Sequence, residues 1–363
     1  MENSLKIENK KKIEWIDMAR VITMLLVIIG HSTYTHIPTD FGSLNYPVPD
    51  GICTSYFILS KLVYFIYSFH MPVFMAISGL CFSLGFHKTT SFRRLATGKG
   101  KRLLIPFVLV TTLVAVPIKY IGGYYSESEN IFHDIILGQY LLMGNSHLWF
   151  LLSLFLCFII FYLIEPVHRK SPLLFWCGLT GLSLSTWIIQ HFIGDGTMGI
   201  PGMTKNLLYF AIGFYSKDWC NRYSPNLFIT LSSVTASIVI FFLCSTINWY
   251  SKQLIAPLFA VWGCFNVLCV CKLILRYTSS TKTASYKFFR NKNFELYLYG
   301  DSANYLIVPA LHTIGGGNYF TSDLFATSSF LIRIAGAVIL TIIILNIINL
   351  AKSTVKVLKY NKA

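Results

Sequence analysis

The stretch "IDMARVITMLLVIIGHSTYTH", residues 16–36, begins like a membrane-spanning helix and yet contains Asp17, Arg20, His31 and His36. Ionisable groups are costly to place in lipid, and there they mark functional sites by default. Arg20 and His31 are eleven residues apart, so in a helix they share one face, about 16 Å apart along the axis, whereas His36 would lie about 140° around the helix from His31. The alternative is a purely structural role, in which Arg20 reaches the membrane interface and His31 only hydrogen-bonds a neighbouring helix.

The composition indicates a membrane protein. The chain has 363 residues, of which 54% are hydrophobic and 12% are charged, and this is too apolar for a soluble protein. The net charge of +15 would suit a nucleic-acid-binding protein. However, apolar runs separate the basic clusters, so a positive bias of the cytoplasmic face is the simpler cause, and no nucleic-acid partner is expected.

The apolar runs predict an all-α integral membrane protein with about ten transmembrane helices, because a helix needs about 20 residues to cross a bilayer. The candidate runs, of which the sixth is short, are residues 15–36, 55–86, 103–122, 147–165, 173–193, 204–219, 227–247, 253–275, 294–314 and 326–350. The first run carries charge and lacks a cleavage motif, so it is not expected to be a cleavable signal peptide. Without an internal repeat, the chain is expected to form a single domain over residues 1–363, with an N-terminal segment of residues 1–14 and a tail of residues 351–363.

The basic residues predict the orientation. With a cytoplasmic N-terminus, 25 of the 30 lysines and arginines fall on the cytoplasmic side. Both termini are therefore expected in the cytoplasm. The nine cysteines are odd in number and form no CxxC pair, so neither a disulfide framework nor a bound metal is expected.

The second run is too long for one straight helix. Its 32 residues would extend about 48 Å, more than the thickness of a bilayer, and Pro72 predicts a bend within it. Six basic residues follow within residues 87–102. Two of them, Lys99 and Arg102, are spaced i and i+3 ahead of an apolar helix, so both can face one ligand. A lysine and an arginine together suit phosphate groups.

These stretches resemble the acyltransferase family 3 membrane O-acyltransferases, including fucose 4-O-acetylase-like proteins, which acylate glycans and lipids from acyl-CoA. The family's first helix carries an arginine, ten residues and a histidine, which Arg20 and His31 match. Its basic Arg-x-x-Arg is matched by Lys99 and Arg102, with lysine in the first place. The resemblance is clearest over residues 15–151 and 293–306.

Three further segments carry the resemblance. "MPVFMAISG", residues 71–79, is similar to a pattern in the family's second span, and "HLWFL", residues 147–151, to the start of its fourth. "NFELYLYGDSANYL", residues 293–306, resembles a late motif that often reads Tyr-Leu-x-His-Pro. Gly300 stands where that histidine would be, so no role is assigned to it.

The resemblance implies an enzyme that moves an acyl group, expected to be acetyl, from acetyl-CoA to a hydroxyl of a cell-surface glycan or lipid-linked sugar. His31 is the expected general base, since histidine titrates near neutral pH. Arg20 would hold the donor or orient the site. The phosphates of coenzyme A are expected to contact Lys99, Arg102, Arg93 and Arg94. The expected location is a bacterial inner membrane, with membrane lipid as its surroundings.

Other polar residues have weaker assignments. Asp17 is spaced to pair with Arg20, which we favour over a catalytic role. His70 and His147 are expected either to line a cavity or to lie at an interface. Trp149 is expected to be an interfacial aromatic, with a place in the cavity lining as the alternative. Asp301 is predicted to pair with Arg333, which lies within the last apolar run and needs a partner there.

The alternative function is a carrier or flippase, because intramembrane arginine and histidine also mark transport pathways. A carrier would be expected to have repeated halves or paired broken helices, and the sequence indicates neither. A carrier function also does not explain the pair Lys99 and Arg102. We find no serine or cysteine nucleophile placed beside His31, so direct transfer is favoured over an acyl-enzyme intermediate.

Overall fold

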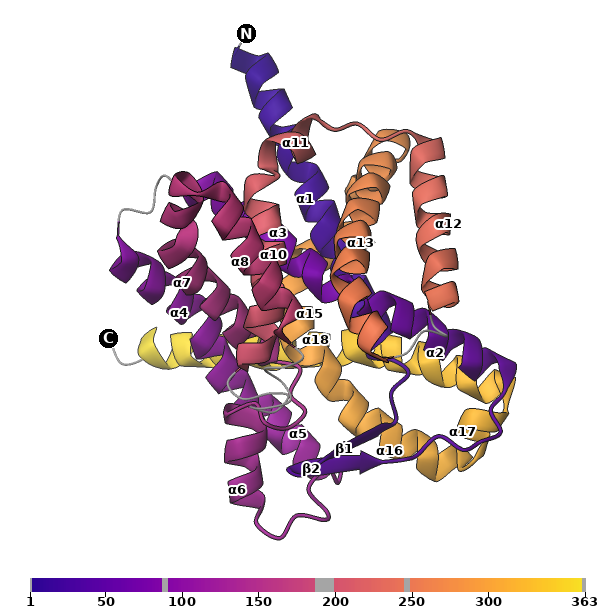
Figure 1. Cartoon of the computed structure of the whole chain (residues 1–363). Coiled ribbons are helices and arrows are strands. Elements are labelled where there is room, and N and C mark those ends of the chain that lie inside the picture. The colour runs from indigo at the N-terminus through magenta and orange to yellow at the C-terminus, as the bar shows by residue number, and fades with distance from the viewer. Residues whose placement is uncertain (1, 87–90, 187–198, 245–248, 361–363) are drawn as a thin grey trace.

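The computed structural model describes residues 2–86, 91–186, 199–244 and 249–360 (Figure 1). These residues are mostly helical, as the sequence predicts. The α-helices are α1 (Glu2–Gly30), α2 (Thr54–Tyr67), α3 (His70–Gly85), α4 (Phe92–Val110), α5 (Val116–Ile121), α6 (Ile131–Ile135), α7 (Trp149–Lys170), α8 (Pro172–Leu184), α10 (Ile200–Tyr215), α11 (Lys217–Arg222), α12 (Leu227–Cys244), α13 (Trp249–Tyr277), α14 (Ala284–Asn291), α15 (Asn293–Tyr299), α16 (Asn304–Gly315), α17 (Asn318–Thr321) and α18 (Asp323–Tyr360).

Shorter elements join these helices. One antiparallel hairpin, β1 (His36–Thr39) and β2 (Gly42–Asn45), follows α1. A π-helical turn, Thr111–Ala115, joins α4 to α5, and another, Ile136–Tyr140, follows α6. Two 3₁₀ turns, Ser280–Lys282 and Gly300–Ala303, precede α14 and α16.

Within these described ranges, six helical segments are long and apolar enough to cross a membrane. They are Thr54–Gly85, Phe92–Ile121, Trp149–Lys170, Leu227–Cys244, Ile255–Tyr277 and Asp323–Thr354. Each coincides with one of the ten predicted runs. The structure therefore supports an all-α protein with several membrane-spanning helices.

The first predicted run is shorter than expected. α1 ends at Gly30, and the chain then turns into the hairpin, so the placement of His36 on this helix is wrong. His36 lies at the start of β1, where it is exposed. His31 directly follows α1, and its backbone N–H still donates to the Val27 carbonyl at 3.0 Å. His31 thus remains in register with the face that carries Arg20.

Three other runs also differ from continuous spans. Residues 294–314 are divided into α15, the turn Gly300–Ala303 and α16. α10 ends at Tyr215 and α8 at Leu184, and residues 187–193 of the fifth run lie outside the described part. The broken run matters most, because its turn carries the buried Asp301.

The predicted bend in the second run is confirmed. α2 ends at Tyr67 and α3 begins at His70. Pro72 has no backbone N–H, and within a continuous helix its ring would clash with the carbonyl of Ser68. The helix therefore breaks just before the proline, which is tolerated in the first turn of α3.

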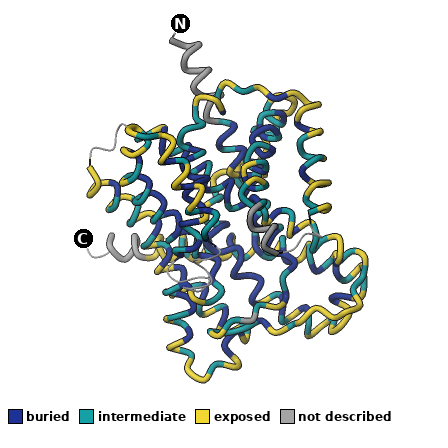
Figure 2. Tube along the Cα trace, viewed as in Figure 1, coloured by how far each residue is buried: buried dark blue, intermediate teal, exposed yellow. Residues whose placement is uncertain are grey.

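α3 packs closely against α10. A Cβ added to Gly79 would lie 1.9 Å from the carbonyl oxygen of Phe210 on α10, and one added to Gly213 would lie 1.9 Å from that of Ala76. Small residues let two backbones approach in this way. α1 contacts α3, α13, α15 and α18, and Figure 2 shows buried residues concentrated where these helices meet. The C-terminal half of α1 therefore lies in the core.

Candidate active site

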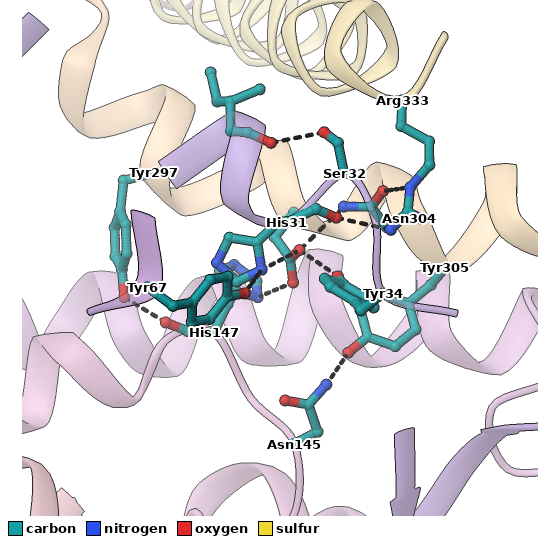
Figure 3. Close-up of polar contacts among 12 residues, drawn as sticks. His31, Ser32, Tyr34, Tyr67, Asn145, His147, Tyr297, Asn304, Tyr305 and Arg333 are labelled. Atoms are coloured by element: carbon teal, nitrogen blue, oxygen red, sulfur yellow. Dashed lines mark hydrogen bonds and ion pairs between the residues drawn. The ribbon is translucent and has the colours of Figure 1, made fainter. Parts of the chain in front are cut away.

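The turn Gly300–Ala303 brings the buried Asp301 to the end of α1. Its Oδ1 lies 3.1 Å from Nδ1 of His31, and its Oδ2 lies 3.4 Å from Nδ1 of His147. The Tyr34 hydroxyl donates a 2.5 Å hydrogen bond to the same Oδ1. The His31 and His147 rings lie close together in Figure 3, with Tyr34 beside them. One carboxylate thus joins two histidines from opposite parts of the chain.

This contact favours one tautomer of the neutral His31 ring. A carboxylate accepts hydrogen bonds, so Nδ1, which faces Asp301, carries the proton in the neutral ring. Nε2 is then left with its lone pair, as a general base requires. The His31 side chain is 22% exposed, so it is held by Asp301 without being closed off.

His147 is less suited to act on a substrate. It is buried, its Nε2 lies 3.1 Å from the carbonyl oxygen of Leu298, and its Nδ1 faces Asp301. Its own carbonyl accepts a 2.5 Å hydrogen bond from the Tyr297 hydroxyl. Nε2 is therefore directed at a backbone carbonyl, while Nδ1 lies beside Asp301 without making a hydrogen bond, and the buried ring packs against the carboxylate.

The predicted ion pair between Asp301 and Arg333 is wrong. Arg333 is 1% exposed and donates to the Asn304 side-chain oxygen at 2.7 Å, the Tyr319 hydroxyl at 2.9 Å and the His31 carbonyl at 2.7 Å. Asn304 in turn donates to Oδ1 of Asp301 at 3.1 Å. Neutral oxygens satisfy the guanidinium, while the carboxylate is occupied by the histidines and Tyr34. Arg333 therefore anchors the backbone of His31.

A second group of predicted residues lines one cavity of about 420 Å³, which we call the basic cavity. Its charged lining residues are Asp17, Arg20, Lys99, Arg102, Arg290 and Glu295. Asp17 and Arg20 are 3.4 Å apart, so their predicted pairing is confirmed. The Lys99 ammonium lies 3.6 Å from the centroid of the Phe158 ring. Helices distant in sequence thus bring several cations to one site.

Two predicted donor-binding residues lie elsewhere. Arg93 and Arg94 are exposed in the first turn of α4 and are not among the residues that line the basic cavity. Arg290 and Asn293, which the sequence motifs did not indicate as binding residues, do line it. Asn293 also donates a 2.9 Å hydrogen bond to the Arg20 carbonyl. Their place in the sequence could have indicated this role, because Arg290 lies three residues before the segment 293–306 and Asn293 begins it.

A larger cavity of about 830 Å³, which we call the histidine cavity, includes His31 in its lining. His31, His70, His147 and Trp149 all line it. Tyr297 lines both this cavity and the basic cavity. It also lines a small cavity shared by His31 and Asp301. The two large cavities therefore meet at Tyr297, and His31 lines the histidine cavity and the small one but not the basic cavity. Within the described ranges, no group of His, Cys, Asp or Glu is arranged to hold a metal ion.

Comparisons with known proteins concern the family of the whole chain and not its site residues. A family model described as "Acyltransferase domain" matches residues 13–345. Nodulation protein NolL of Mesorhizobium japonicum is 31% identical over 158 residues, which are 43% of this chain and 36% of that protein. The chain thus spans little more than a third of the length of this curated relative. No solved structure matches the chain.

Proposed function

Because the chain belongs to the acyltransferase family whose domain model covers residues 13–345, we propose that it is a multi-pass membrane O-acyltransferase. The donor is acyl-CoA, with acetyl as the transferred group, and the acceptor is a hydroxyl of a cell-surface glycan or lipid-linked sugar. The observation that carries this proposal is the contact between His31 and Asp301 beside Tyr297, the residue that lines both large cavities. It supplies an oriented base close to separate spaces for donor and acceptor.

The basic cavity suits the donor. Coenzyme A carries several phosphate charges, and Arg20, Lys99, Arg102 and Arg290 line this cavity. Arginine binds phosphate in a bidentate manner, whereas lysine acts as a point charge. The thioester arm would extend past Tyr297 toward His31. By the distribution of basic residues, this donor side faces the cytoplasm.

The acceptor would enter the histidine cavity. Nε2 of His31 takes the hydroxyl proton while the hydroxyl oxygen attacks the thioester carbonyl carbon. The carbon–sulfur bond then breaks, and the protonated His31 returns its proton to the leaving thiolate. The Arg333 bond to the His31 carbonyl and the Asp301 contact to Nδ1 hold the ring in place for both transfers.

Direct transfer is favoured over an acyl-enzyme. The described side chains in contact with the His31 ring belong to Asp301, Tyr34 and Tyr67. None of these is the serine or cysteine that a covalent route through His31 would activate. We also propose ten spans with both termini in the cytoplasm of a bacterial cell. The acyltransferase unit would occupy the whole chain as a single domain.

Glycan analysis tests the reaction class. A strain lacking the gene is complemented with the wild-type chain or with His31→Ala, and O-acetyl groups on surface glycans are quantified. We expect wild type to restore them and His31→Ala to leave them absent at equal protein level. Restoration by both would contradict the proposal. Loss of the whole glycan, rather than of its acetyl groups, would favour a carrier.

A further inference from the structure

Lys205 projects from α10 into the histidine cavity. It is the only lysine or arginine among the described residues that line this cavity. Its neighbours Thr204 and Asn206 are 5% and 2% exposed, whereas Lys205 is exposed. The cavity therefore contains a single side chain with a permanent positive charge.

Three other cations, Lys119, Arg333 and Lys272, donate to protein acceptors. Lys119 donates to the Gln139 side-chain oxygen at 2.8 Å and to the Asn145 carbonyl, and Arg333 has three oxygen acceptors. Lys272 donates to the carbonyls of Cys220 and Tyr223. In contrast, the Lys205 ammonium has no carboxylate or hydrogen-bond acceptor within range among the described residues. The Lys205 ammonium is therefore available to bind an anion that enters the cavity.

The surroundings of Lys205 connect it with the base. His31, His70 and Lys205 all line the histidine cavity, so the lysine and the base face the same space. Trp149, which is partly buried, lines the cavity too and packs against Gly202 one turn before Lys205. Its ring offers a broad apolar surface to the C–H face of a sugar.

We propose that Lys205 binds an anionic group of the acceptor, either the carboxylate of a sugar acid or the phosphate of a lipid-linked sugar. A hydrogen bond between a lysine ammonium and an anion is stronger than one between neutral groups. The anion holds the sugar at one end while a hydroxyl of the same acceptor faces His31. This inference rests on the proposed function, because it assigns the histidine cavity to the acceptor.

Binding to the purified full chain in detergent tests this site. The probes are glucuronic acid, glucose 1-phosphate and glucose, titrated by calorimetry into wild type, Lys205→Gln, Lys205→Arg and Lys217→Gln. Lys217 is a matched control, because it begins α11 and lines none of the described cavities. We expect wild type to bind at least one anionic probe about tenfold or more tightly than glucose, the size expected for a charged hydrogen bond.

The variants decide whether Lys205 is responsible. Lys205→Gln should abolish the preference for the anion, while Lys205→Arg and Lys217→Gln keep it. The probe that is preferred, carboxylate or phosphate, identifies the source of the anion. Equal binding of all three probes by wild type, no binding of either anionic probe, or an unchanged preference in Lys205→Gln would overturn the inference.

Binding of acetyl-CoA to the same samples separates this inference from the proposed function. We expect acetyl-CoA to bind wild type and Lys205→Gln equally. A Lys205-dependent anion preference without any acetyl-CoA binding would contradict the proposed function and leave the anion site standing. Acetyl-CoA binding without any anion preference would contradict the anion site and leave the proposed function standing.

Discussion

Oδ1 of Asp301 lies 3.1 Å from Nδ1 of His31, although the two residues come from opposite ends of the chain. His31 follows α1, and Asp301 lies in the turn between α15 and α16. The contact places the proton on Nδ1 and leaves Nε2 free to accept another. The position of this one carboxylate therefore determines whether His31 can act as a base.

Asp301→Asn tests the effect of the carboxylate at nearly constant volume. An amide no longer favours the proton on Nδ1 of His31, so we expect acyl transfer to fall by about a hundred- to ten-thousandfold, the usual contribution of general-base catalysis. Acyl-CoA binding should be retained, since Asp301 does not line the basic cavity. Single-turnover transfer and donor binding are measured separately. A loss below tenfold would show that Asp301 is structural only.

Charge reversal tests the basic cavity. Lys99→Glu combined with Arg102→Glu should weaken acyl-CoA binding strongly, because both side chains line the cavity. The matched control is Arg93→Glu with Arg94→Glu, which makes the same change in charge on exposed residues of the same helix. Donor affinity is measured by titration at fixed ionic strength. Equal losses in the two double variants would leave only a general attraction between charges.

Arg333 is expected to couple to Asn304. Removing either partner in Arg333→Met or Asn304→Ala leaves buried polar groups unsatisfied, at about 1–3 kcal/mol for each group. The double variant should therefore lose less stability than the sum of the two single losses. Thermal unfolding in detergent provides the measurement. Ser183→Ala serves as the control, because Ser183 shares no hydrogen-bond partner with Arg333. Its loss of stability should add to that of Arg333→Met. If the losses of Asn304→Ala and Arg333→Met also add, the coupling is ruled out.

The contact between α3 and α10 depends on Gly213. A Cβ at this position would lie 1.9 Å from the Ala76 carbonyl oxygen, so Gly213→Ala must shift the backbone and is expected to destabilise the protein by about 1–3 kcal/mol. Gly178 on α8 has no atom within 4 Å of the equivalent position. Gly178→Ala should therefore leave the melting temperature unchanged or raise it. Equal melting temperatures for the two variants would contradict the packing.

The sequence predicted the parts of the site that depend on local spacing. Lys99 and Arg102 line one cavity, because a helix places residues three positions apart on one side. The pairing of Arg20 with Asp17 has the same origin. These relationships follow from a single helix and need no knowledge of its neighbours. Arg20 and His31, which the spacing placed on one face, line different cavities.

The Asp301 contacts could not be predicted in this way. They depend on a 3₁₀ turn that interrupts an apolar run and on packing between distant helices. Arg333 was assigned to Asp301 because opposite charges attract, whereas three neutral oxygens satisfy it in the folded chain. The signal that was present is the pair Asp301 and Asn304, two polar residues three positions apart within an apolar run.

Acyl transfer by His31→Ala, compared with His36→Ala, tests the assignment of the base most directly. His31 contacts Asp301 and lines the histidine cavity, whereas His36 is exposed at the start of β1. Both variants are purified as monodisperse protein, and acetyl-CoA binding and acetyl transfer to glycan extracted from the deletion strain are measured separately. We predict that His31→Ala binds acetyl-CoA normally but loses transfer by about a hundredfold or more, and that His36→Ala retains both. Transfer by His31→Ala at the wild-type rate would contradict the assignment of His31 as the general base.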